Sequence, residues 1–273
     1  MSTWVQVFFE DKVETVETST RVRVLGQDLH LTLVMVRSWK RLDHVLIDEC
    51  EGVVPEMLSK GAWAGTILWD AAVHLTRRVL TQYRCQLEDP TNSLRVLELG
   101  AGIGVPGMAA RVAGAKHVVL TEQEELLRLL HVNLAANQKV LRLPNAAAKA
   151  DKTVDAKEGI VARPLSWGVQ QTMEYLAQYP DEKVDVVLSC DCIYEPLYGT
   201  SWRALAQTME LLCEANPECV VLVCVERRNQ DGVDNFLEFV EKETKLMSKL
   251  DEQTTGTDDN QLEVYILGLS ACT

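Results

Sequence analysis

Strand-like and helix-like hydrophobic patterns alternate along most of the chain. Short apolar runs predict strands, and stretches with an apolar residue at every third or fourth position predict helices. The expected strands cover 94–99, 117–121, 160–165, 184–190 and 219–226, and the expected helices cover 105–113, 124–137, 169–178, 197–215 and 232–249. Because expected strands and helices alternate, the pattern predicts an α/β fold with helices on both faces of a parallel sheet.

The two ends of the chain depart from this alternation. Residues 4–36 alternate between apolar and polar positions and predict a small β-rich extension, so we divide the chain into 1–60 and 61–273. Near the other end, 262–267 predict a strong final strand. No helix separates it from the chain before it, so it is expected to join the sheet antiparallel to its neighbour. The segment 246–250 is too charged to predict a strand.

A strand that contains a carboxylate is followed directly by a glycine-rich turn. Glu98 lies inside the apolar strand, and Gly100, Gly102 and Gly104 come after it, before an Ala-rich helix. Glycine adopts the positive φ angles of tight turns, and the first turn of a helix carries free N–H groups. The turn is therefore expected to bind a nucleoside-containing cofactor against its backbone.

Two classes of cofactor fit this turn. The spacing Gly102-x-Gly104-x-x-Gly107 matches the dinucleotide-binding pattern, with Glu122 near the position of a ribose-binding acid, which is typical of an NAD(P)-dependent oxidoreductase. S-adenosylmethionine is favoured, because it carries an ammonium and a sulfonium and no phosphate. The negative charge of Glu98 would stabilise such a ligand and would repel a pyrophosphate.

Two further features favour S-adenosylmethionine. Asp191 and Tyr194 follow the fourth expected strand, which places an acid and a phenol at the carboxyl edge of the sheet, where open α/β folds bind ligands. The final strand at 262–267 fits a methyltransferase sheet, which ends in an antiparallel hairpin.

Charge and cysteine content exclude several classes of partner. The chain carries 27 basic and 40 acidic residues, a net charge of −13, which argues against a nucleic-acid ligand and fits a basic partner protein. Its eight cysteines form no CxxC pair and are expected to be reduced thiols in the cytoplasm or nucleus. The N-terminus lacks a signal-peptide pattern, the apolar runs are too short for a bilayer, and no metal is expected, because the histidines lack metal-ligand spacing.

Several short pieces of the chain together carry a family resemblance. They are Gly65-Thr66-Ile67-Leu68-Trp69-Asp70-Ala71-Ala72, Val96 to Pro106, Thr121-Glu122, Leu165-Ser166-Trp167-Gly168, Asp191-Cys192-Ile193-Tyr194-Glu195 and Glu226-Arg227-Arg228. In this order they resemble the seven-stranded, S-adenosylmethionine-dependent protein-lysine methyltransferases grouped as family 16. The resemblance implies a Rossmann-like seven-stranded methyltransferase sheet with an antiparallel last strand in 61–273, and it leaves the extension 1–60 unmatched.

The resemblance also implies roles for individual residues. The strand carboxylate and the glycine turn would hold the methionine end of the cofactor, Glu122 its ribose hydroxyls and Trp167 its adenine. The cofactor-binding positions are Trp69, Glu98, Gly100, Ala101, Gly102, Gly104, Glu122, Trp167 and Cys190. Asp191 and Tyr194 would be the catalytic residues that face the sulfonium and the incoming amine.

The expected reaction is methyl transfer to a lysine side chain of a partner protein. A translation factor or a chaperone is the expected substrate, by resemblance to related enzymes, and the enzyme is expected to be a monomer that binds neither nucleic acid nor membrane. Two alternatives stay open here: a non-catalytic interaction protein with a methyltransferase fold, and the oxidoreductase described above. A small-molecule or nucleic-acid acceptor is a third alternative within the methyltransferase interpretation.

Overall fold

A seven-stranded sheet forms the centre of the molecule in the computed structural model, which describes residues 5–9, 16–24, 27–35, 62–66, 68–89, 91, 93–142, 158–256 and 260–269. Its strand order is β6-β5-β4-β7-β8-β10-β9, and β10 is antiparallel to both of its neighbours while the other neighbouring pairs are parallel. The strands are β4 (Arg95–Leu99), β5 (His117–Glu122), β6 (Gly159–Pro164), β7 (Val186–Cys190), β8 (Val220–Glu226), β9 (Leu246–Thr255) and β10 (Gln261–Leu269). The predicted α/β class, the parallel order and the antiparallel last strand are confirmed.

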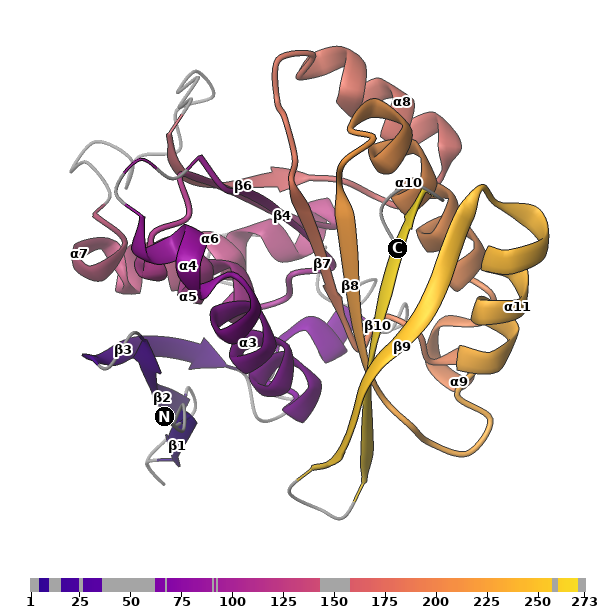
Figure 1. The fold of residues 1–273 in the computed structure, drawn as a ribbon. Coiled ribbons are helices and arrows are strands. Elements are labelled where there is room, and N and C mark those ends of the chain that lie inside the picture. Colours follow the sequence, from indigo (N-terminus) through magenta and orange to yellow (C-terminus); the bar gives the residue numbers. More distant parts are fainter. Residues whose placement is uncertain are drawn as a thin grey trace.

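Helices cover both faces of this sheet (Figure 1). One face carries α3 (Asp70–Gln82), α4 (Arg84–Glu88), α5 (Val105–Ala113), α6 (Leu127–Ala136) and α7 (Gln138–Leu141). The short 3-10 helices η1 (Ala62–Thr66) and η2 (Glu124–Leu126) precede α3 and α6 along the chain. The other face carries α8 (Val169–Gln178), α10 (Trp202–Ala215) and α11 (Val233–Glu243), and the short α9 (Glu195–Tyr198) follows β7. Successive residues of each strand point to opposite faces, so Val96 packs in the core beneath α5 while Leu97 and Leu99 pack in the core beneath α10.

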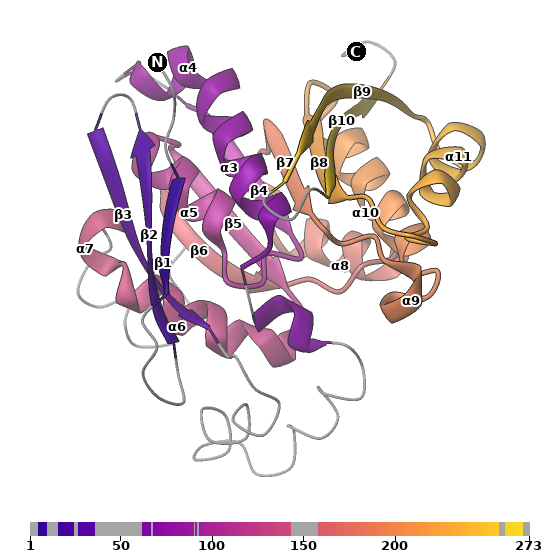
Figure 2. The same ribbon diagram turned by 90° about the horizontal axis from the view of Figure 1, so that it is seen from below.

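A second, three-stranded antiparallel sheet lies at the N-terminal end of the chain, in the order β1-β2-β3. Its strands are β1 (Val5–Phe9), β2 (Val16–Val24) and β3 (Gln27–Met35), as the alternating pattern predicts. Figure 2 shows this sheet outside the helices of one face, with β3 against α6. Leu31 and Leu33 are fully buried in the same core as α5 and α6. The predicted boundary at residue 60 lies outside the described residues and stays a prediction.

The predictions for 232–249 are wrong in part. The helix ends at Glu243, and the charged segment from Leu246 begins the strand β9, which pairs with β10 along its whole length. Charge does not exclude a strand here, because β9 is the edge strand of the sheet and exposes most of its side chains. Only Leu246 of this strand is buried, so the hydrophobic pattern that identifies central strands is missing.

None of the helices in the described part of the chain combines the length and the apolar composition that a membrane crossing requires.

Candidate functional site

A cavity of about 470 Å³ lies at the carboxyl ends of β4, β5 and β7. Eight of the predicted site residues line it, although they come from five separate segments of the chain. They are Trp69, Gly100, Ala101, Gly102, Glu122, Trp167, Cys190 and Asp191. Parallel strands bring these segments together because their carboxyl ends meet at one edge of the sheet. Glu98, Gly104 and Tyr194 do not line the cavity.

The glycine turn is packed on several sides by protein. Gly100, Gly102 and Gly104 have φ angles of 62°, 55° and 79°. A Cβ atom on Gly102 would lie 2.9 Å from the carbonyl oxygen of Gly65, and one on Gly100 would lie 2.6 Å from Cys192 Sγ. The sequence interpretation left these side-chain positions to a ligand. The structure fills them with neighbouring backbone and side chains, while the turn still presents its backbone to the cavity.

Glu122 ties the glycine turn to the end of β5. Its Oε2 accepts the N–H of Gly102 at 2.8 Å, and its Oε1 accepts the N–H of Gln123 at 2.8 Å. Burial raises the pKa of this carboxyl, against the lowering effect of these two bonds. A carboxylate has about four acceptor positions, so Glu122 retains capacity to accept hydrogen bonds from two ligand hydroxyls in the cavity.

Glu98 lies under the turn and outside the cavity. Its side chain points to the same face as Val96, toward α5, and its Oε2 accepts the N–H of Gly107 at 2.9 Å. This N–H belongs to the first turn of α5, which has no acceptor within the helix. Glu98 is fully buried, and its Oε1 has no hydrogen-bond partner. Burial raises its pKa to about 8, with the Gly107 N–H opposing the shift and Glu122 adding to it.

Asp191 also lines the cavity, and Arg228 holds its carboxylate. Its Oδ2 accepts a hydrogen bond from Arg228 Nη2 at 2.7 Å, and its Oδ1 accepts from Arg228 Nη1 at 3.1 Å and from the Glu226 N–H at 3.2 Å. The backbone of Asp191 has a φ of 53°, a left-handed conformation that Asp tolerates better than most residues. The predicted catalytic carboxylate is thus present at the sheet edge, in a two-bond ion pair.

Arg228 links Asp191 to two aromatic residues. Its guanidinium carbon lies 5.5 Å from the ring centre of Trp69 and 5.3 Å from that of Tyr194. Tyr194, the second predicted catalytic residue, therefore contacts the site through Arg228, while Trp69 reaches both the cavity and Arg228. The resemblance included Arg228 without a role, although its position directly after β8 placed it at the same sheet edge.

Several residues of the cavity wall were not predicted. Gly65 approaches the glycine turn from η1, Leu126 and Tyr198 add apolar surface, and Ser201 has a buried hydroxyl with no hydrogen-bond partner. Gly65 belongs to a piece that carried the family resemblance, whereas no sequence signal marked Ser201.

The thiols of this region are not activated nucleophiles. Burial raises the pKa of Cys192 to about 12 and raises that of Cys190 well above its usual value, so both are neutral near pH 7. The described residues include no cluster of three or more His, Cys, Asp or Glu side chains that could hold a metal. The cavity is therefore suited to binding and alignment rather than to thiol chemistry.

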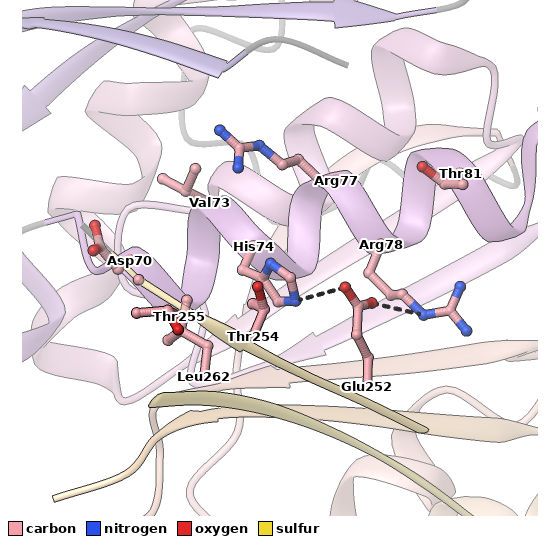
Figure 3. Close-up of a pocket in the computed structure, with 11 residues that line it drawn as sticks. Asp70, Val73, His74, Arg77, Arg78, Thr81, Glu252, Thr254, Thr255 and Leu262 are labelled. Carbon is pink, nitrogen blue, oxygen red and sulfur yellow. Dashed lines mark ion pairs between the residues drawn. The ribbon is translucent and has the colours of Figure 1, made fainter. Parts of the chain in front are cut away.

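A second pocket, of about 510 Å³, lies between α3 and the β9–β10 hairpin (Figure 3). His74 Nε2 and Arg78 Nε lie 3.4 and 3.5 Å from the Glu252 carboxylate, and Arg78 also pairs with Asp251. Burial lowers the pKa of His74, with Glu252 opposing the shift. These contacts fasten α3 to the edge strand, and no predicted site residue lines this pocket.

Comparison with known proteins points to one family. The family model described as lysine methyltransferase matches residues 57–243. Secreted RxLR effector protein 48 of Plasmopara viticola is 68% identical over 166 residues, covering 61% of this chain and 80% of that protein. Protein N-lysine methyltransferase METTL21A of Danio rerio is 31% identical over 200 residues, 73% of this chain and 74% of that protein. EEF1A lysine methyltransferase 3 of Xenopus tropicalis is 28% identical over 173 residues, 63% of this chain and 62% of that protein.

Gly102→Ala should reduce the affinity for S-adenosylmethionine roughly tenfold or more, about 1.4 kcal/mol. The new Cβ would press on the Gly65 carbonyl and displace the turn that Glu122 holds. Gly159→Ala is the control, because Gly159 also has a positive φ, of 123°, but has no atom within 4 Å of the Cβ position and lies at the other end of β6. Calorimetric titration of both folded variants tests the prediction, and equal affinities would contradict it.

Glu98→Gln should change how stability depends on pH. Because the pKa of Glu98 is about 8 in the folded protein and near its usual 4.5 when unfolded, the native state binds its proton more tightly. The wild type should therefore lose stability relative to the variant as pH rises from about 4.5 to about 8. Glutamine keeps an acceptor for the Gly107 N–H. Urea unfolding at pH 5, 6, 7 and 8 checks this, and a constant difference between the two proteins would contradict it.

Proposed function

Since this chain belongs to the lysine methyltransferase family and is an S-adenosylmethionine-dependent protein-lysine methyltransferase, we propose that the acceptor lysine enters the cavity beside Asp191, on the side where Arg228 contacts Tyr194. Family membership decides between the two cofactors considered above, in favour of S-adenosylmethionine. The observation that carries the proposal is that Asp191 lines the same cavity as Glu122 and the glycine turn.

The cavity suits a nucleoside of this size. Its volume of about 470 Å³ lies within the range of small-molecule sites. Glu122 would accept hydrogen bonds from the ribose hydroxyls, the half-buried Trp167 would pack on the adenine, and the backbone of Gly100 and Gly102 would hold the methionine end. When bound, S-adenosylmethionine supplies an activated methyl group on a sulfonium.

The residues on the Asp191 side would prepare the acceptor amine. A lysine side chain has a pKa near 10.4 and arrives as an ammonium, which the carboxylates of Asp191 and Glu226 attract. Transfer needs the neutral amine, and removal from water favours that form. The ring of Tyr194 would limit the directions from which the amine approaches, and such alignment accounts for a large part of rate acceleration in displacement reactions.

We propose a translation elongation factor as the substrate, with a chaperone as the second choice. EEF1A lysine methyltransferase 3 of Xenopus tropicalis supports the first choice by its name. The net charge of −13 favours a basic surface around the target lysine. The enzyme is proposed to act as a monomer.

We also propose that the enzyme acts in a reducing compartment, the cytoplasm or the nucleus. The described cysteines Cys85, Cys190, Cys192, Cys213, Cys219 and Cys224 are all free thiols. The relative from Plasmopara viticola is named a secreted effector, so the proposed compartment is tested by locating the protein in cell fractions and in the culture medium. Recovery of the protein from the medium alone would contradict the proposal.

Incubation of the purified chain with isotope-labelled S-adenosylmethionine and a methylation-deficient lysate should label a protein band. Mass spectrometry should place the label on a lysine side chain, because the proposed acceptor group is an amine. A label on arginine, on an N-terminus or on nucleic acid would contradict the proposed acceptor.

Asp191→Asn should lower the transfer rate roughly 100-fold, a loss typical of removing a charged group that acts on the reacting atoms. Asparagine preserves the acceptor for the Glu226 N–H and the left-handed backbone, so the affinity for S-adenosylmethionine should stay within a few-fold. Asp234→Asn is the control, since that side chain is 83% exposed and pairs with Arg227. An equal loss of transfer and cofactor affinity in Asp191→Asn would reject the catalytic assignment.

A further inference from the structure

The guanidinium of Arg228 occupies an enclosure made for a cation. Asp191 accepts two hydrogen bonds from it, and Glu226 Oε2 accepts a third from Nη2 at 2.8 Å. The rings of Trp69 and Tyr194 lie 5.5 and 5.3 Å from its central carbon. Two carboxylates and two aromatic rings around one positive charge form a set of groups that also suits an alkylammonium ion.

This enclosure adjoins the cofactor cavity. Asp191 and Trp69 each contact Arg228 and line the cavity, so they form the wall shared by the two spaces. An amine held between Asp191 and Tyr194 would therefore be next to the methyl donor.

From these contacts we propose that Arg228 occupies the position of the substrate lysine ammonium, and that its side chain must withdraw before the lysine can bind. The inference rests on the function proposed above. Arg228 is then an internal competitor that reduces the affinity for any lysine that does not dock with enough additional contacts, and so contributes to substrate selection.

The side chain of Arg228 can withdraw without moving the backbone that carries it. The Arg228 N–H donates to Asp231 Oδ2 at 2.9 Å, and the neighbouring Arg227 binds Asp231 and Glu263 at 3.0 and 3.2 Å. These bonds fix the loop after β8 independently of the Arg228 guanidinium. That side chain is 22% exposed, so it has a route to solvent.

Asp191 and Glu226 would keep hydrogen-bond donors and a neighbouring cation when a lysine ammonium replaces the Arg228 guanidinium. After withdrawal, Asp191 still accepts the Glu226 N–H at 3.2 Å, and Glu226 Oε1 still accepts from Asn260 Nδ2 at 2.7 Å. The incoming ammonium replaces the lost positive charge, so no buried carboxylate is left without a cation. The exchange of one cation for another is therefore much less costly than removal of the Arg228 cation alone, which would leave two buried carboxylates without a positive charge.

Binding of n-butylammonium, a mimic of the lysine side chain, tests the proposal without methyl transfer. The full chain saturated with S-adenosylhomocysteine is titrated by calorimetry as wild type, Arg228→Ala, Arg228→Gln and the control Arg203→Gln. Arg203 also stacks on aromatic rings, those of Trp202 and Phe239, and lines no part of the cavity. Both Arg228 variants should bind n-butylammonium roughly tenfold or more tightly than wild type and Arg203→Gln. Guanidinium at millimolar concentration should compete with n-butylammonium for binding to both Arg228 variants.

Three results would overturn the proposal. The first is equal affinity for n-butylammonium in all four proteins. The second is failure of both Arg228 variants to fold, because a cation that leaves during turnover cannot be required for the fold. The third is loss of lysate methylation in Arg228→Ala with recovery on addition of guanidinium, which would make Arg228 a positioning residue for Asp191. Absence of methylation by the wild type would instead count against the proposed function, and the binding titration does not depend on it.

Discussion

The hydrogen bond from the Gly102 N–H to the Glu122 carboxylate is the interaction on which the site depends. It joins the turn after β4 to the end of β5, and the close approach of Gly65 holds the turn from the other side. Beneath the turn, Glu98 binds the Gly107 N–H and fixes the start of α5. Two buried carboxyl groups thus hold one stretch of backbone from two directions, which is why the turn can present its backbone to a ligand without a supporting side chain of its own.

The sheet and its covering helices could be predicted because burial imposes a period on the sequence. Strands such as Val186–Cys190 are buried on both faces and mostly apolar, and a helix such as Trp202–Ala215 is apolar along one face. The strand at Leu246–Thr255 could not be predicted in this way, because it is held by backbone pairing to β10 at the edge of the sheet and buries only one of its side chains. Hydrogen bonding between backbones leaves no hydrophobic pattern to detect.

The site was predictable at the level of segments and not of contacts. Glycine spacing and family order identified the turn, Glu122 and Asp191, and parallel strand order brings them to one cavity. The orientation of Glu98 follows from strand alternation, which turns its side chain toward α5 rather than into the cavity. The bond between Asp191 and Arg228 joins residues 37 positions apart, and no local pattern in the sequence marks such a pair. The position of Arg228 depends on the path of the loop after β8, so this ion pair can be recognised only in the three-dimensional structure.

The left-handed backbone at Asp191 also restricts how this protein can vary. Most residues resist a positive φ, whereas aspartate, asparagine and glycine accept it. Of these three, aspartate alone carries a negative charge. The backbone conformation at the end of β7, together with the need for a negative charge, therefore leaves aspartate as the residue type that satisfies both requirements. Glutamate bears the same charge but adopts a positive φ less readily, so it is a poor replacement. Amino-acid substitutions among homologues should accordingly be rarer at the position of Asp191 than at neighbouring positions.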